Sequence, residues 1–297
     1  MAIRSIAAIA TLVFLAPAAY LAQQPTATPQ LVPAPETPRR PVTSAFNQNW
    51  LDAVVSIELE DPQGKDPQPV GTGFLVRTAH DHLLLVTAKH VVERPGANAA
   101  RLGYRLNTNQ GASQMLWDRD VVARGLGNWF MSATDLACRF IGFSADGKFR
   151  TITTADFLDD TSDLSAASPL LVLGFPLGLR STGYTRPIAR QGIVARADPD
   201  LILADAFVFP GNSGGPVIYL PPFKAGRGIQ SPYLNEEKLV GIVSSYVPYR
   251  EEAISLQTRR PRIVFEENTG LANIIPVREL RKVMESEPVR KLDTTIK

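Results

Sequence analysis

A single serine stands in a run of glycine and proline that could present it as a nucleophile. The run is PGNSGGPV, residues 210–217, and its serine is Ser213. It follows the apolar segment LILADAFVF and suits neither the interior of a helix nor a strand. One interpretation is a tight surface turn. The other is a loop shaped to present the hydroxyl for nucleophilic catalysis.

A catalytic serine needs a base within hydrogen-bond reach, and that base usually needs an orienting carboxylate. Among three histidines, His90 is the candidate base because it ends the strand-like segment LLLVTAKHVV. Asp135 in SATDLACRF opens an apolar segment, where a carboxylate is costly to bury without hydrogen bonds. Taken singly, each is better explained as a structural residue. The triad hypothesis depends on their occurring together.

The remaining titratable candidates favour structural roles. His80 and His82 flank Asp81 in TAHDHL between two apolar runs, which predicts solvated residues of a hairpin turn. An H-x-H metal site would need a third ligand that the sequence does not supply. Cys138 is the one cysteine, so an intramolecular disulfide is excluded, and its apolar segment predicts a buried small side chain. The sequence implies no metal and no organic cofactor.

The elements that would position these residues are predominantly strands. From Phe46 onward, short apolar or alternating runs recur between Gly, Pro, Asn and Asp, which predicts an all-β barrel or sandwich. No helical periodicity precedes residue 276, whereas 276–286 places Val277, Leu280 and Met284 on one side and predicts a C-terminal helix covering a sheet. The predicted strands are 53–60, 71–78, 82–90, 135–143, 170–175, 191–197, 201–209, 214–220, 238–247 and 271–277.

Three polar segments interrupt these strands. The first, 153–169, divides the strands into two sets of similar size, as expected for two barrels joined by a connector. The other two, 221–237 and 248–269, are inserted between late strands and predict long loops. Such loops either contact substrate or are decoration of the surface.

VTAKHVV, TDLA and PGNSGGPV, in the order His, Asp, Ser, resemble the motifs of the trypsin-like serine proteases. VGTGFLV, GFPLGL, ADAFVFPGNSGG and a late GIV followed by IIPV resemble the HtrA/Deg branch of exported bacterial proteases. The resemblance covers about residues 50–280. It implies a chymotrypsin-like protease domain over 46–290, all-β, with two six-stranded antiparallel β-barrels at about 46–152 and 168–277 and a C-terminal helix. HtrA/Deg relatives usually carry PDZ domains, but finishing the second barrel and its helix takes most of the chain after Ser213, so we expect none here.

The resemblance implies a role for each candidate residue. Ser213 would attack the scissile carbonyl, His90 would transfer the proton, and Asp135 would orient the imidazole. Ser244 matches the position of a serine hydroxyl that supports the aspartate. The backbone N–H groups of Gly211 and Ser213 would form the oxyanion hole.

The resemblance also implies a primary specificity pocket. Its base matches Phe207, six residues before the serine, beside Val208, and its opposite wall matches Ser244, Ser245 and Tyr246. Because Phe207 is not an acid, cleavage after Arg or Lys is not expected. A tyrosine at 246 would narrow or cap the pocket and favour Val, Ala or Leu. The alternative is that Tyr246 turns into solvent and has no bearing on specificity.

The N-terminus predicts export. Arg4, an apolar stretch over 6–15 and Ala16-Pro17-Ala18 indicate that 1–22 is a cleaved signal peptide. The alternatives are an uncleaved membrane anchor or a buried helix. Residues 23–45 are rich in proline and predict an extended linker. Either of the first two interpretations places the folded part in the periplasm or outside the cell, in the second case attached to a membrane.

These observations predict an exported serine endopeptidase that acts on proteins or peptides, in protein quality control or regulated proteolysis. Its 297 residues carry a net charge of +2, too small to favour nucleic acid. A homo-oligomer is compatible with the resemblance. The alternatives are a catalytically silent binding or chaperone module, and an esterase or acyl transferase with the same chemistry. The order His–Asp–Ser argues against an α/β-hydrolase.

Overall fold

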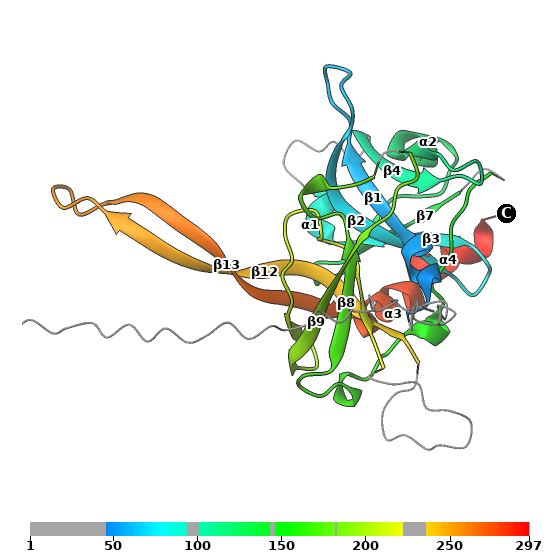
Figure 1. Cartoon of the computed structure of the whole chain (residues 1–297). Coiled ribbons are helices and arrows are strands. Elements are labelled where there is room, and N and C mark those ends of the chain that lie inside the picture. Colours follow the sequence, from blue (N-terminus) through cyan, green and yellow to red (C-terminus); the bar gives the residue numbers. More distant parts are fainter. Residues whose placement is uncertain (1–45, 94–100, 143–145, 182, 222–235, 297) are drawn as a thin grey trace, which may run out of the picture. The chain divides into compact units, whose positions relative to one another are not determined.

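The computed structural model describes residues 46–93, 101–142, 146–181, 183–221 and 236–296. Within these ranges the chain forms two groups of antiparallel strands with helices at its C-terminal end (Figure 1). The predicted signal or anchor at 1–22 and the linker at 23–45 lie outside the described residues. Among the described helices, none has the length and apolar character needed to cross a membrane.

The first group is a seven-stranded sheet in the order β5-β4-β1-β2-β3-β7-β6, and the second is a closed barrel in the order β10-β13-β12-β11-β8-β9. The strands of the sheet are β1 Val54–Leu59, β2 Gln68–Arg77, β3 Leu83–Thr87, β4 Leu102–Asn107, β5 Ser113–Trp117, β6 Phe130–Met131 and β7 Ala137–Ile141. Those of the barrel are β8 Pro169–Gly174, β9 Ile188–Ala197, β10 Ile202–Asp205, β11 Pro216–Tyr219, β12 Lys238–Ile254 and β13 Pro261–Pro276.

The predicted all-β class and the six-stranded second barrel are confirmed. The first group differs from the expected six-stranded barrel in two ways: it is a sheet rather than a closed barrel, and it has a seventh strand, β6, at one edge. This strand has only two residues, Phe130 and Met131, which pair with Cys138 and Ala137 of β7. An apolar run of two residues is too short to predict as a strand.

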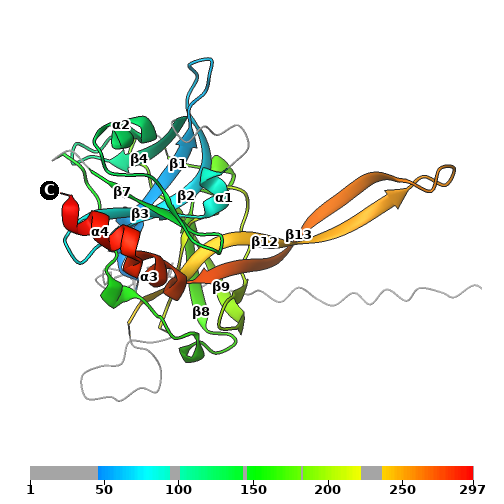
Figure 2. The same cartoon turned by 180° about the vertical axis from the view of Figure 1, so that it is seen from behind.

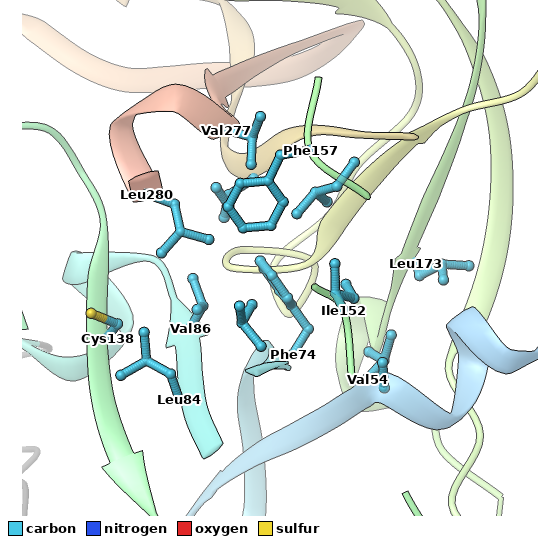
Figure 3. Packing of buried hydrophobic residues seen from close by; sticks show 14 of the residues in the cluster. Val54, Phe74, Leu84, Val86, Cys138, Ile152, Phe157, Leu173, Val277 and Leu280 are labelled. Carbon is cyan, nitrogen blue, oxygen red and sulfur yellow. The ribbon is translucent and has the colours of Figure 1, made fainter. Parts of the chain in front are cut away.

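The core strands have continuous apolar sequences because they are buried on both faces. Alternate side chains of a strand point to opposite sides. In β2, Phe74 joins an apolar cluster that both groups of strands share, while Leu75 packs inside the sheet. In β8, Leu173 joins the same cluster and Val172 packs inside the barrel. This shared core, drawn in Figure 3, fixes the sheet and the barrel against each other.

Two C-terminal helices close the shared core. The predicted helix is confirmed as α3, Val277–Glu285, whose Val277 and Leu280 are fully buried in the core (Figure 3). A further helix, α4 Glu287–Thr295, follows directly and buries Val289. It was not predicted, because a proline in its first turn interrupts the pattern and it contributes few apolar residues.

Short helical turns lie between the strands. They were not expected, because each is too brief to produce a 3.6-residue apolar pattern. The α-helical ones are α1 Lys89–Val92 and α2 Asp118–Ala123, and the 3-10 turns are η1 Gln48–Ala53, η3 Thr154–Asp156, η4 Thr161–Asp163 and η5 Pro176–Gly178.

The segment 248–269, predicted to be a long loop, is a β-hairpin. The strands β12 and β13 continue past the barrel as a two-stranded ribbon over 248–268, which we call the arm (Figures 1 and 2). The loop prediction was wrong because the ribbon is exposed on both faces and therefore lacks an apolar alternation. Of the other segment predicted to be a loop, 222–235 lie outside the described residues.

His80 and His82 lie in the predicted turn, where His80 is exposed, but both share a structural partner that was not predicted. Each ring Nδ1 lies 2.9 Å from a carboxylate oxygen of Asp293 in α4, and Thr78 donates to the same carboxylate at 2.6 Å. Burial raises the pKa of Asp293, but these three hydrogen bonds outweigh it and hold the pKa below its ordinary value. The carboxylate thereby fastens α4 to the turn between β2 and β3.

We expect Asp293→Asn to lower the free energy of unfolding by about 1–3 kcal/mol at pH 7, because an amide offers one acceptor oxygen where three donors converge. A carboxyl whose folded pKa is depressed stabilises the fold above its unfolded pKa, and this contribution is lost as the pH falls through the folded value. The difference from the wild type should therefore close below the ordinary pKa of 3.8. Urea unfolding between pH 3 and 7 measures it, and a pH-independent difference would contradict the assignment.

Candidate active site

The structure places His90 directly against Asp135. The strand β3 ends at Thr87, and His90 lies in α1 rather than in the strand where it was predicted. Its backbone N–H donates to Asp135 Oδ1 at 2.9 Å, and its ring Nδ1 lies 2.8 Å from Oδ2. An ionised carboxylate can only accept, so Nδ1 carries the proton and Nε2 of the neutral ring is left as a base.

A third hydrogen bond to Asp135 comes from the barrel. Ser244 in β12 donates its hydroxyl to Asp135 Oδ2 at 2.7 Å. Partial burial raises the pKa of Asp135. The hydrogen bonds from His90 and Ser244 lower it by more, so the net pKa lies below the ordinary value. The carboxylate is therefore ionised at neutral pH and holds the ring from one side.

The loop around Ser213, residues 209–215, needs its glycines for two reasons. Gly211 and Gly214 have φ of +99° and +84°, which side chains other than hydrogen rarely allow. A Cβ at Gly211 would also lie 2.3 Å from Phe175 O, and one at Gly214 would lie 2.2 Å from Thr72 O. The glycine-rich sequence thus follows from backbone conformation and from close approach of neighbouring strands.

Two backbone donors in this loop have no acceptor among the described residues. The N–H groups of Asn212 and Gly214 donate to nearby carbonyl oxygens at 2.9 and 2.8 Å. By contrast, within the described part of the chain the N–H groups of Gly211 and Ser213 donate to no protein group. Both residues line the same pocket, so the two donors can serve an oxygen of a bound molecule.

The hydroxyl of Ser213 is turned toward the barrel. It donates to the carbonyl oxygen of Ser244 at 3.3 Å, and the described residues include no hydrogen bond between Ser213 and His90. Such hydrogen bonds are often long or misaligned before substrate binds. His90 and Ser213 nevertheless line one pocket together.

This pocket has a volume of about 600 Å³. Of the predicted specificity residues, Val208, Ser245 and Tyr246 line it, whereas Phe207 does not. The side chain of Phe207 is 51% exposed, and its ring lies beside Gly270 in β13. The complete lining is Val70, His90, Val91, Glu93, Val208, Phe209, Pro210, Gly211, Ser213, Val243, Ser244, Ser245 and Tyr246.

Tyr246 is held in place by the arm. Its hydroxyl donates to the carboxylate of Glu266, which also accepts from Arg250 Nε at 2.9 Å. The hydrogen bond to Glu266 raises the pKa of the Tyr246 hydroxyl, so the phenol remains neutral. The tyrosine is thus fixed at the pocket by partners that lie in the segment predicted to be a loop.

Thr72 is a positioning residue that the sequence analysis did not identify. It is fully buried in β2. Its Oγ1 donates to Gly211 O at 2.6 Å and accepts from Phe175 N at 3.0 Å, while its N–H donates to Ser213 O at 2.9 Å. The only signal in the sequence is a polar residue between two glycines in VGTGFLV.

Comparisons with known proteins identify the family of the chain. A family model described as the trypsin-like peptidase domain matches residues 71–219, half of the chain, and the chain belongs to this family. A "Serine protease HtrA-like" from Staphylococcus aureus (strain bovine RF122 / ET3-1) is 26% identical over 82% of this chain and 28% of its own length. A "Serine protease Do-like HtrA" from Bacillus subtilis (strain 168) is 28% identical over 65% of this chain and 41% of its own length. The chain thus aligns with less than half of each relative.

One solved structure, described as "HtrA-type protease AlgWS227A with tripeptide", is 16% identical, with a TM-score of 0.44, and covers 80% of this chain and 61% of the other.

We expect Thr72→Val to slow the reaction of Ser213 with a fluorophosphonate probe by roughly 10- to 100-fold, because small displacements of reacting groups are costly. The valine leaves Phe175 N–H without its acceptor and Gly211 O without its donor, which lowers stability by about 1–3 kcal/mol. Thr72→Ser keeps the hydroxyl and should recover most of the rate. Equal losses in both variants would indicate that the methyl group, and not the hydroxyl, positions the loop.

Proposed function

We propose that the protein is a serine endopeptidase in which Ser213, His90 and Asp135 form the catalytic triad. One observation carries the proposal: Asp135 holds His90 through two hydrogen bonds, on the wall of a pocket that Ser213 also lines. The named relatives are serine proteases, which supports the same reaction class.

The geometry suits acyl transfer from a peptide to the serine. On substrate binding the Ser213 hydroxyl turns from Ser244 O toward His90, gives its proton to Nε2 and attacks the carbonyl carbon. Asp135 stabilises the imidazolium that forms. The proton then passes to the leaving amine as the C–N bond breaks, and water hydrolyses the acyl-enzyme by the same steps in reverse.

The N–H groups of Gly211 and Ser213 are the proposed oxyanion hole. They are the donors in the loop that lack an acceptor in the part of the chain that the structure describes, and negative charge develops on the substrate oxygen during attack. Removing one such donor typically costs about 2.7–4 kcal/mol of transition-state stabilisation. The positive φ of Gly211 and its close contact with Phe175 are the structural conditions for these donors.

The pocket favours an aliphatic side chain on the substrate. Val208, Val243 and Tyr246 supply apolar surface, and Tyr246 is restrained by Glu266. We therefore propose cleavage after Val, Ala or Leu. Since Phe207 does not line the pocket, selectivity would depend mainly on Tyr246 and the valines.

The proposed site of action is outside the cytoplasm. The N-terminal sequence supports export, with 1–22 as a cleaved signal or a membrane anchor. A role in protein quality control or regulated proteolysis would follow from the similarity to HtrA-like proteases. A silent binding module and an esterase remain the competing functions, and the next experiment separates them.

We expect the full chain to react with a fluorophosphonate probe and to cleave a peptide library, while Ser213→Ala does neither. Removing a triad serine abolishes nearly all chemistry, by a factor on the order of a million in a comparable enzyme. Thermal unfolding of both proteins checks that the substitution leaves the fold intact.

The two readouts distinguish the alternatives. Labelling together with peptide cleavage supports the endopeptidase. Labelling with hydrolysis of esters but not peptides would favour the esterase. A folded protein that resists the probe would point to the silent binding module.

Tyr246→Gly should widen the pocket, so kcat/KM for Phe at the cleaved position should rise relative to Val by roughly 10-fold or more, the scale set by apolar pocket contacts. Phe207→Ala is the matched control, since Phe207 lies outside the pocket and its removal should leave the ratio unchanged. A shift caused by Phe207→Ala and not by Tyr246→Gly would restore Phe207 as the base of the pocket.

A further inference from the structure

The arm carries an unusual concentration of exposed apolar side chains. Six of the twelve large hydrophobic residues exposed in the described chain lie between 249 and 265. The six are Tyr249, Ile254, Leu256, Ile263, Val264 and Phe265, with exposed fractions from 53% to 88%.

The arm has no third strand to support it among the described residues. β11 pairs with β12 only as far as Ile242, and β10 pairs with β13 only from Leu271 onward. A two-stranded ribbon alone is marginally stable in water, and its open edges invite pairing with another chain. The tip is nevertheless a closed turn, in which Arg259 N and Ser255 N each donate to a carbonyl across it.

The two faces of the arm differ. Residues paired across a ribbon lie on the same face, and successive pairs alternate between faces. Arg250 pairs with Glu266 on the face that reaches Tyr246. The opposite face holds the pairs Tyr249–Glu267, Glu251–Phe265 and Ala253–Ile263, so its apolar members form an apolar strip beside two carboxylates.

Charge is segregated along the arm. Its four arginines and four glutamates balance, but Arg259, Arg260 and Arg262 lie at the tip, while the glutamates lie toward the barrel. The glutamates are Glu251, Glu252, Glu266 and Glu267. Two such arms laid antiparallel would place each basic tip against the acidic base of the other, with the apolar strips between them.

We propose that the arm is a homodimerisation element that pairs with the arm of a second copy of this chain in antiparallel orientation. The self-complementary charge pattern favours this occupant, because a two-fold axis presents the same surface to itself in reverse. Pairing of the two apolar strips would bury apolar surface that a single arm leaves exposed to water, and this burial favours association.

Other occupants match the arm less well. An anionic membrane would attract the three tip arginines but would repel the four glutamates behind them. An extended polypeptide could pair with an open edge, yet such pairing does not require opposite charges at the two ends of the arm. The segregation of charge is explained by antiparallel pairing of two copies.

Dimerisation would also act on the pocket. β12 continues from Ser244 through Tyr246 into the arm, with shifts in its register to β13 at Ser244 and Val247, and Glu266 of the arm holds the Tyr246 hydroxyl. A second arm packed on the ribbon would restrict the motion of Glu266 and therefore that of Tyr246. The proposal on oligomeric state is independent of the proposed catalytic function.

A charge-swap series tests the proposal in the full chain carrying Ser213→Ala, which prevents self-cleavage. Tip reversal replaces Arg259, Arg260 and Arg262 with Glu, and base reversal replaces Glu251, Glu252 and Glu267 with Arg. Sedimentation velocity across a concentration series should give a dimer for the parent. Each reversal alone should weaken the dimer by at least about tenfold, and the combined variant should restore it.

Arg124→Glu, Arg290→Glu and Lys291→Glu together form the matched control, since they reverse three exposed basic residues outside the arm. This control should leave the dimer intact. The proposal would be overturned if the parent stayed monomeric up to a protein concentration of about 100 μM, because a specific dimer would form well below that concentration. A dimer that tolerates both reversals, or a combined variant that stays dissociated, would overturn it as well.

Binding to vesicles containing phosphatidylserine is measured in parallel. A parent that is monomeric in solution but binds these vesicles through the tip arginines would replace the dimer with a membrane contact. Thermal unfolding of every variant separates weaker association from loss of the fold.

Discussion

The active-site geometry depends on a buried threonine that belongs to neither the triad nor the pocket lining. Thr72 lies in the first sheet, and its side chain and backbone bind the carbonyl oxygens on both sides of Asn212. Its Oγ1 also accepts the N–H of Phe175, at the end of β8. One residue thus ties the serine loop to the sheet that carries His90, and its buried hydroxyl both donates and accepts a hydrogen bond.

The proposed triad is divided between the two groups of strands, which explains why such a connection is needed. His90 follows β3 and Asp135 precedes β7, both strands of the sheet. Ser213 and Ser244 belong to the barrel. Their alignment therefore requires the sheet and the barrel to keep a fixed relation, which the shared core and the Ser244–Asp135 hydrogen bond maintain. The C-terminal helices, fastened by Asp293, close that core. The contacts that stabilise this fold are therefore also the contacts that align the site.

The sequence predicted the features that depend on local chemistry. Glycines around Ser213 and apolar runs bounded by turn residues have direct backbone causes, and Cys138 is confirmed as a buried side chain, where burial raises its thiol pKa to about 12. Features that depend on tertiary partners were not predicted. Arg139 is fully buried, where it forms an ion pair with Asp118 and lies over the ring of Trp129. No local sequence pattern predicts such contacts. The arm was missed for the opposite reason, since strands exposed on both faces carry no apolar period.

β12 connects the barrel, the pocket and the arm in a single strand. Its first half forms the barrel wall, Ser244 supports Asp135, Tyr246 lines the pocket, and its second half is the arm. Between Tyr246 and the arm the pairing of β12 with β13 shifts register at Val247, and the Tyr246 hydroxyl reaches the arm through its hydrogen bond to Glu266. Any contact that orders the arm must therefore act on Glu266 and Tyr246 before it reaches Asp135. Specificity would respond to such a contact more readily than the proposed triad, in which His90 and Asp135 are fixed from the other side by the sheet.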